Sequence, residues 1–356
     1  MKKNQIIALC FCFLFCCGVL LSLYAVSPIS KEIFRANFKR TFLSRATVRD
    51  QKLLDIEFNT FYFAGVNDST TYLGNFTAPA HLLKVEANLK DSSHTRLEII
   101  GVDSVVAPKR FKLTVAGKSF FMTHGNIPLI VSGSTSDWRA KTFIRDSAYY
   151  FVEALPITKS KTILKSYHLM ERSYELGLKS TDSLVFNTSL LNKQIDGAFC
   201  VDGKLLYDDL TNSVVYVHLY RNEIIVTDTS LNLRYRTHTI DTFSRAHIKV
   251  SKLNSDGTES MISAPPVQLN SLSCVDSGKL YVKSNILASN EVEEHFLNDS
   301  VIDVYDLTNE GAYLYSFCIP SFEGYKPSGF MVRGNRLMAI FDHHLASFTL
   351  DETFPL

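Results

Sequence analysis

Residues 274–317 contain the clearest indication of the fold. It reads CVDSGKL at Cys274–Leu280, then VIDVYDL at Val301–Leu307, and it ends with the apolar run Ala312–Phe317. The first segment places a polar Asp-Ser-Gly turn between two short apolar runs, which is typical of a tight β-hairpin. The two later segments are rich in β-branched and aromatic residues and are separated by a polar turn, so each predicts a strand. The stretch therefore predicts four consecutive antiparallel strands.

Looser copies of this pattern occur elsewhere in the chain. They read IRDSAYY at Ile144–Tyr150, CVDGKL at Cys200–Leu205 and MVRGNRL at Met331–Leu337, and ILKSYHL at Ile163–Leu169 resembles the third strand. The successive intervals from Ile144 to Val201, Val275 and Val332 are 57, 74 and 57 residues. Four strands repeated about every 50–60 residues is the layout of a β-propeller blade. We predict an all-β propeller of roughly five to seven blades, with six favoured.

Two further features fit a ring of blades. The longest interval has its excess between Ser244 and Asn270, a polar segment that we interpret as an inserted hairpin or long loop on one rim. The last strand, near His344–Leu350, is expected to complete a blade with a strand around Leu53–Phe58 and so close the ring. Two β-sandwich domains divided near Ser180 remain the alternative fold.

The composition agrees with a strand-rich globular domain. Hydrophobic residues make up 46% of the 356 residues, including 25 Phe and 16 Tyr, and this aromatic content favours strands. The net charge of +1 provides no global field that would attract nucleic acid, so we expect no nucleic-acid partner.

The hairpins and the VIDVYDL strand resemble bacterial propellers of the NHL/YncE kind, and also membrane-anchored propeller-like proteins of bacteria. The resemblance covers roughly residues 55–350. It implies a rigid ring that binds a partner through its loops, and it implies no cofactor.

The N-terminus predicts a membrane anchor. Ile6–Val26 contains no charged residue and is long enough to cross a hydrocarbon core. Lys2 and Lys3 precede it, as in a secretory signal, but no good cleavage site follows, so we expect an uncleaved signal-anchor. The predicted organisation is a cytoplasmic tip (1–5), the transmembrane helix (6–26), a basic juxtamembrane segment (27–54) and the propeller-like domain (55–356).

The sequence leaves two alternatives for the side of the membrane on which the domain lies, and two for the structure of the juxtamembrane segment. The export-like start places the domain in the periplasm, as a single-pass inner-membrane protein, whereas the basic residues after the helix favour a cytoplasmic domain. Phe34, Phe38 and Phe42 recur every four residues, which predicts an amphipathic helix on anionic headgroups. The alternative is a charged linker whose short hydrophobic face docks on the domain.

No residue set specifies a reaction. Cys200, Cys274 and Cys318 are an odd number without metal-binding spacing, and His343-His344 on a strand would point to opposite faces, so we predict no metal site. The candidate ligand-binding residues are a cationic cluster and the single tryptophan; they are Arg234, Arg236, His238, Arg245, His247 and Trp138. Each has a plainer alternative, namely solvated β-surface for the cluster and packing under a blade rim for Trp138.

Two function classes follow. The first is a membrane-tethered, non-enzymatic propeller that binds a small ligand or an envelope or membrane protein through its loop face. The second is an enzyme, such as a hydrolase, lyase or redox protein, whose residues converge at the propeller axis from several blades. Polar His, Arg and Asp side chains from three or more blades meeting at the axis would favour the second class.

Overall fold

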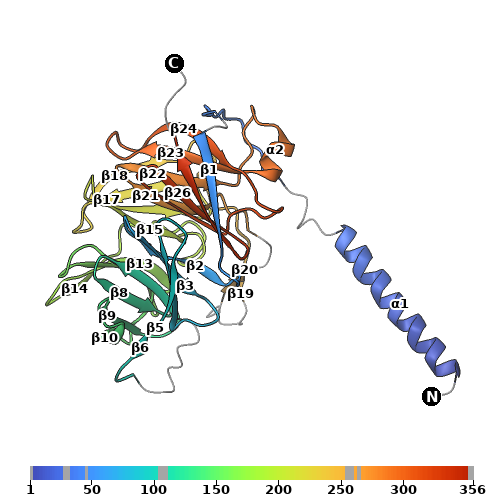
Figure 1. The fold of residues 1–356 in the computed structure, drawn as a ribbon, viewed down its shortest axis with the longest axis horizontal. Coiled ribbons are helices and arrows are strands. Elements are labelled where there is room, and N and C mark those ends of the chain that lie inside the picture. Colours follow the sequence, from blue (N-terminus) through green and yellow to red (C-terminus); the bar gives the residue numbers. More distant parts are fainter. Residues whose placement is uncertain are drawn as a thin grey trace. The chain divides into compact units, whose positions relative to one another are not determined.

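The computed structural model describes residues 3–26, 33–44, 47–102, 111–252, 260–262 and 266–351. The chain divides into two compact units, Met1–Phe34 and Arg35–Leu356. The first unit contains helix α1 (Lys3–Val26), shown in Figure 1. Its segment Gln5–Tyr24 has a mean hydropathy of 2.8 and is not buried in the protein. By length and composition it can cross a membrane, and both an anchor and a signal sequence fit this description.

The second unit is a six-bladed β-propeller, which confirms the predicted fold and excludes the two-sandwich alternative. Each blade has four antiparallel strands, which pair in sequence order in blades 1–5, whereas the outermost strand of blade 6 is the N-terminal β1. Blade 1 is β2 (Phe61–Val66), β3 (Thr70–Asn75), β4 (His81–Glu86) and β5 (Ser92–Arg96); blade 2 is β7 (Lys112–Ala116), β8 (Ser119–Thr123), β9 (Leu129–Ser134) and β10 (Arg139–Arg145), with β6 (Glu98–Ile99) parallel on its edge; blade 3 is β11 (Tyr149–Pro156), β12 (Thr162–His168), β13 (Ser173–Lys179) and β14 (Leu184–Asn187). Blade 4 is β15 (Gly203–Asp208), β16 (Ser213–His218), β17 (Glu223–Thr227) and β18 (Leu233–His238); blade 5 is β21 (Asn270–Asp276), β22 (Lys279–Ser284), β23 (Ser300–Asp306) and β24 (Ala312–Ile319), with the short helix α2 (Glu293–Asn298) between β22 and β23; blade 6 is β25 (Gly329–Arg333), β26 (Arg336–Phe341), β27 (His344–Leu350) and β1 (Val48–Asp55).

The first strand of each blade lies innermost. The inner strands β2, β7, β11, β15, β21 and β25 are neighbours in this order, and β25 lies beside β2, so they form a closed ring around the axis. The final hairpin is completed by the N-terminal strand, because β1 pairs with β27 from Val48↔Leu350 to Asp55↔His344. This confirms the predicted ring closure. The strand begins earlier than expected, and residues 48–54 therefore belong to the propeller and not to a juxtamembrane segment. The sequence suggested a charged segment outside the domain because most side chains of this edge strand are exposed and polar.

The core is divided among the interfaces between blades. Each of the six clusters of buried apolar side chains joins two adjacent blades, so that every pair of neighbours around the ring shares one. Strands β16 and β23 are buried on both faces over most of their length. A single blade cannot bury two apolar faces by itself, and the ring is therefore the smallest stable unit.

The repeated hairpin pattern of the sequence occurs four times. Only two of these copies form the hairpin between the first two strands of a blade. Between β21 and β22, Ser277 and Gly278 have φ of 51° and 78°, as a tight hairpin turn between right-twisted strands requires. The copy at Met331–Leu337 is the equivalent hairpin of blade 6. The copy at Ile144–Tyr150 instead joins β10 to β11 of the next blade, and Cys200 precedes β15. Cys200 and Cys274, which align in the sequence repeat, therefore do not occupy equivalent positions in their blades. The predicted insertion is a hairpin, β19 (Val250–Lys252) with β20 (Ser260–Ile262), between blades 4 and 5.

Residues 35–43, here called the strap, run along blade 5 without forming a helix. Isolated bridges join Arg35 to Leu287 and Phe42 to Ser316, and Phe38 and Leu43 are buried. The predicted amphipathic helix is therefore wrong over the described residues 33–44, and the docked alternative describes the strap. The phenylalanine spacing had suggested a helix, but hydrogen bonds to blade 5 hold the backbone extended.

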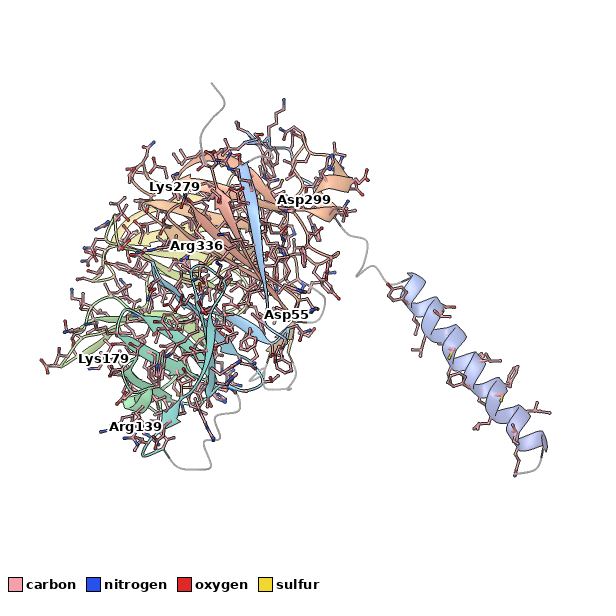
Figure 2. The ribbon with its side chains drawn as sticks, in the orientation of Figure 1. Asp55, Arg139, Lys179, Lys279, Asp299 and Arg336 are labelled. Carbon is pink, nitrogen blue, oxygen red and sulfur yellow. The ribbon has the colours of Figure 1, made fainter. Side chains whose placement is uncertain are left out.

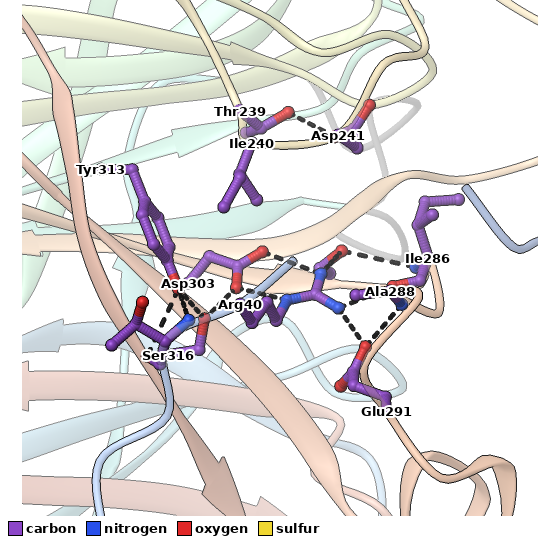
Figure 3. Close-up of polar contacts among 12 residues, drawn as sticks. Arg40, Thr239, Ile240, Asp241, Ile286, Ala288, Glu291, Asp303, Tyr313 and Ser316 are labelled. Atoms are coloured by element: carbon purple, nitrogen blue, oxygen red, sulfur yellow. Dashed lines mark hydrogen bonds and ion pairs between the residues drawn. The ribbon is translucent and has the colours of Figure 1, made fainter. Parts of the chain in front are cut away.

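Arg40 fastens the strap to blade 5, as Figure 3 shows. Its fully buried guanidinium donates from Nε to Asp303 Oδ1 at 2.7 Å and from Nη2 to Asp303 Oδ2 at 3.0 Å. It also pairs with Glu291 and donates to the carbonyl oxygen of Ile286 and to Ser284 Oγ. The strap is thereby joined to blade 5 by a fully bonded internal ion pair.

Candidate functional site

Two arginines of the predicted cationic cluster, Arg234 and Arg236, lie on β18, the outermost strand of blade 4. Arg234 donates to the carbonyl oxygen of Thr211 and to Ser213 Oγ, at 2.8 and 2.7 Å. Arg236 donates to Glu223 Oε1 at 2.6 Å and to the carbonyl oxygen of Leu190 at 2.8 Å. Both guanidinium groups therefore already have internal partners.

The other members of the predicted set are dispersed. His238 is exposed at the end of β18. Arg245 and His247 are exposed in the connection to blade 5, where the His247 ring packs edge-on against Phe243 at 5.4 Å. No hydrogen bond or ion pair in the described part of the chain links Arg245 or His247 to the β18 side chains.

Trp138 is buried, with 6% of its surface exposed. Its ring stacks on Phe120 at 5.3 Å, and the ammonium of Lys84 lies over it at 4.8 Å. The expectation of an exposed contact residue is thus corrected in favour of packing between blades 1 and 2. A polar stretch of sequence had suggested a surface loop, but φ of 57° at this residue turns the side chain into the core.

Charged side chains from three blades meet near the axis on the inner strands. Lys112 is the first residue of β7, Glu153 lies on β11 and Lys204 is the second residue of β15. Lys204 Nζ is 3.5 Å from Glu153 Oε2, which also accepts a hydrogen bond from the backbone of Leu205 at 3.4 Å. We call this set, together with Lys165 and Asp202, the axial lysine cluster.

Lys165 and Asp202 form an ion pair beside the inner-strand residues of the cluster. Lys165 lies on β12, and its buried ammonium donates to Asp202 Oδ1 at 2.5 Å and to the carbonyl oxygen of Gly203 at 2.7 Å. The same ammonium lies 4.9 Å from the ring centre of Tyr174. Burial alone would lower the pKa of Lys165, but the surrounding acidic groups raise it above its usual value, so this lysine stays charged.

The cluster carries more positive than negative charge. The charge of Lys204 and burial together lower the pKa of Lys112 to about 8, although Glu153 opposes this shift. Burial disfavours the ionised form of Glu153, but the lysine charges outweigh it and lower its pKa to about 2. Near neutral pH three ammonium groups thus face two carboxylates. Such a site attracts an anionic group, and Lys112 can also lose a proton near pH 8.

The opposite ends of the inner strands form a pocket of about 660 Å³. It is built by the turns that follow the inner strands of blades 1, 4, 5 and 6. Arg333 is paired there with Asp68 at 2.9 Å and with Asp276 at 3.3 Å, while Arg336 (labelled in Figure 2) donates to the carbonyl oxygen of Asn67 at 3.3 Å. The lining residues are Asp68, Asp209, Leu210, Asp276, Ser277, Arg333, Gly334, Asn335 and Arg336. Three aspartates and two arginines line the pocket, so its formal charge is negative, whereas that of the lysine cluster is positive.

His343 and His344 lie together, contrary to the expectation that they point to opposite faces. His343 occupies a turn after Asp342, whose φ is 47°, and only His344 belongs to a strand. The two ring centres are 4.1 Å apart, and potential ligand atoms of Asp55, His343 and His344 lie within 4.8 Å of one another. The sequence-based expectation is wrong because it assumed that both histidines belong to one strand, whereas His343 lies in a turn.

Sequence reasoning missed the axial lysine cluster. The available signal was a charged residue inside an otherwise apolar strand, as at Lys165 in TILKSYH and at Lys112 in KLTVA. Such residues are rare in buried strands unless they are paired or functional.

Comparisons with known proteins support the fold. No family model and no curated protein matches the chain. Among solved structures, the chain resembles a putative exported protein from Bacteroides fragilis, with a TM-score of 0.54, 10% identity and coverage of 90% of this chain and 99% of the other. It also resembles a streptogramin B lyase, with a TM-score of 0.52, 10% identity and coverage of 86% of this chain and 100% of the other. At this identity the likeness establishes a β-propeller fold and nothing finer.

Proposed function

We propose that this protein is a membrane-tethered binding propeller whose axial lysine cluster holds an anionic group of its ligand. The group is a carboxylate or phosphate, carried by a small molecule or by an acidic segment of an envelope or membrane protein. The observation that carries the proposal is the surplus positive charge of Lys112 and Lys204, which are partly exposed on the inner strands of two blades. Ammonium groups that already repel each other gain from an added anion.

The tether in this proposal is helix α1, which stays uncleaved and places the propeller in the periplasm. Its length, its apolar composition and the basic start at Lys2 and Lys3 support this arrangement. Tethering keeps a binding domain at the membrane surface, so a membrane or envelope protein is the partner that it meets most often.

The test uses the full chain in detergent at low ionic strength, with citrate and inorganic phosphate as probes. Lys112→Met and Lys204→Met remove one ammonium each and retain an apolar side chain of similar length. We expect citrate affinity to fall at least about 10-fold in either variant, since a charge-assisted contact contributes roughly 1.5–3 kcal/mol. Lys118→Met, in the exposed turn after β7, is the control and should bind citrate as the wild type does. Equal affinity in all four proteins would exclude the cluster as the binding site.

An enzymatic role is the second candidate, and the pKa of about 8 for Lys112 supports it. A lysine that is partly neutral near pH 8 can act as a base or attack a carbonyl carbon. Incubation with pyruvate followed by borohydride tests this role, because amine and carbonyl condense to an imine with loss of water, and reduction makes the adduct stable. A selective adduct on Lys112 would favour the enzyme, whereas random surface labelling would favour binding alone.

A further inference from the structure

The two ends of the propeller chain meet at one corner of blade 6. Asp55 is the last residue of β1, and Figure 2 shows it at the end of that strand. It lies opposite His344, the first residue of β27, in the antiparallel ladder. The backbone N–H of Ile56 donates to the carbonyl oxygen of His343 at 2.9 Å and fixes the adjoining turn. The strand pair and the adjoining turn thus bring the backbone of Asp55, His343 and His344 together.

The donor atoms have the identity and spacing of a transition-metal site. Two imidazole nitrogens and one carboxylate oxygen are ligands that Zn²⁺ prefers, at about 2.0–2.2 Å each. The three donor atoms lie within 4.8 Å of one another, so small side-chain rotations bring them onto one ion. Asp55 Oδ1 accepts a hydrogen bond from the backbone of Glu57 at 2.7 Å, which leaves the other carboxylate oxygen to bind.

The surroundings orient the histidines for this role. His343 Nδ1 is 2.9 Å from Asp342 Oδ2, an arrangement that directs Nε2 away from Asp342 and is typical of carboxylate–histidine–metal sites. The His344 ring packs edge-on against Phe322 at 5.2 Å. The acidic groups that act on His343 are Asp55, Asp342 and Glu323, so the corner as a whole is anionic.

We propose that Asp55, His343 and His344 bind one divalent transition-metal ion, with Zn²⁺ as the best fit, and that the ion cross-links the N-terminal strand to the C-terminal hairpin. Three protein ligands leave a fourth position open to solvent. A cross-link at this point closes a loop that contains nearly the whole propeller. It therefore opposes the detachment of β1, the step by which a ring completed by its N-terminal strand opens at its edge.

The test uses the full chain in detergent after treatment with a chelator, with Zn²⁺ alone as the probe. Equilibrium dialysis with metal analysis measures stoichiometry and affinity, and the thermal midpoint is recorded with and without metal. We expect one tightly held Zn²⁺ per chain and a rise of about 5 °C in Tm at 100-fold excess over Kd. Asp55→Asn should weaken binding at least 10-fold, and the double variant His343→Gln/His344→Gln should abolish both binding and the rise in Tm.

His238→Gln, which removes an exposed histidine from blade 4, is the matched control and should behave as the wild type. Asp55→Asn changes an exposed side chain, so it decides the result if the double variant folds poorly. Unchanged Zn²⁺ binding in Asp55→Asn and in the double variant would overturn the site. So would a loss of binding in His81→Gln, because His81 and His94 form a separate pair with ring nitrogens 2.9 Å apart. Binding at the proposed residues without a rise in Tm would overturn the cross-linking role.

Discussion

Replacing Arg40 by methionine should destabilise the propeller strongly, because it removes the centre of the strap's attachment. The Arg40 guanidinium is 0% exposed, and the side chains of Asp303 and Glu291 are only 2% and 6% exposed. Without Arg40 both carboxylates remain buried without their cation. Removing one partner of a buried ion pair costs about 3–5 kcal/mol, and we expect a loss in this range at pH 7.

The strap itself contains a matched control. Arg35 is also an arginine paired with a glutamate, Glu293, at 3.3 Å, but these side chains are 59% and 55% exposed. Arg35→Met should therefore cost no more than about 1 kcal/mol, as exposed ion pairs do. Adding Asp303→Asn to Arg40→Met should recover part of the loss, since the second change removes one of the two unpaired charges.

The loss should also depend on pH. In the wild type, burial raises the pKa of Glu291 even though Arg40 opposes the shift. Without Arg40 that pKa rises further, so the folded variant binds more protons than the unfolded chain. Stability of the variant is then lost as the pH rises through this raised pKa, and the difference from wild type should be smaller at pH 5 than at pH 7.

Urea unfolding of the full chain in detergent measures these effects, with the fluorescence of the single tryptophan as the probe. A cost for Arg40→Met equal to that for Arg35→Met would refute the reasoning. It would mean that the strap detaches without loss, or that water reaches the two carboxylates in the folded state.

Four further predictions concern other parts of the molecule. Acylation of Lys112, followed by mass spectrometry across pH, should show a midpoint near 8, and Lys204→Met should move it toward the usual lysine pKa; a midpoint that does not move would contradict the proposed repulsion. Trp138 should emit at short wavelength and resist quenching by acrylamide, and Trp138→Ala should cost about 3–5 kcal/mol in unfolding free energy. Cys200 and Cys274 are both buried in different blade interfaces, so thiol reagents should label them slowly until urea unfolds the chain, and rapid labelling of either would exclude this packing. A periplasm-active reporter fused to the C-terminus should give signal where a cytoplasm-active one does not, and mature protein should retain helix α1; the opposite reporter result would reverse the proposed orientation.

Local patterns in the sequence predicted the architecture well where a structural unit is contiguous. The turn at Ser277-Gly278 requires positive φ at both central residues, and that demand is visible in the residue types. The strand-turn-strand pattern at Ile144–Tyr150 is equally clear, but its two strands belong to different blades. The sequence shows that two strands are consecutive in the chain, but whether they pair in one sheet depends on their positions in the folded ring.

The sequence alone therefore predicted the apolar helix and the strand-rich domain, because each depends on residues close together in the chain. It also indicated six blades and the ring closure, although only two of the four repeat copies mark the same hairpin. The tertiary structure decided the contents of every site. Lys112, Glu153 and Lys204 come from three blades, and Asp55 meets His343 only when the ring closes. Trp138 and Arg40 lie in stretches that read as surface, yet neighbouring elements enclose both. The physical reason is that charge pairing, burial and ligand geometry depend on distances between side chains, and in a propeller those distances are set across blade interfaces that join segments far apart in the chain.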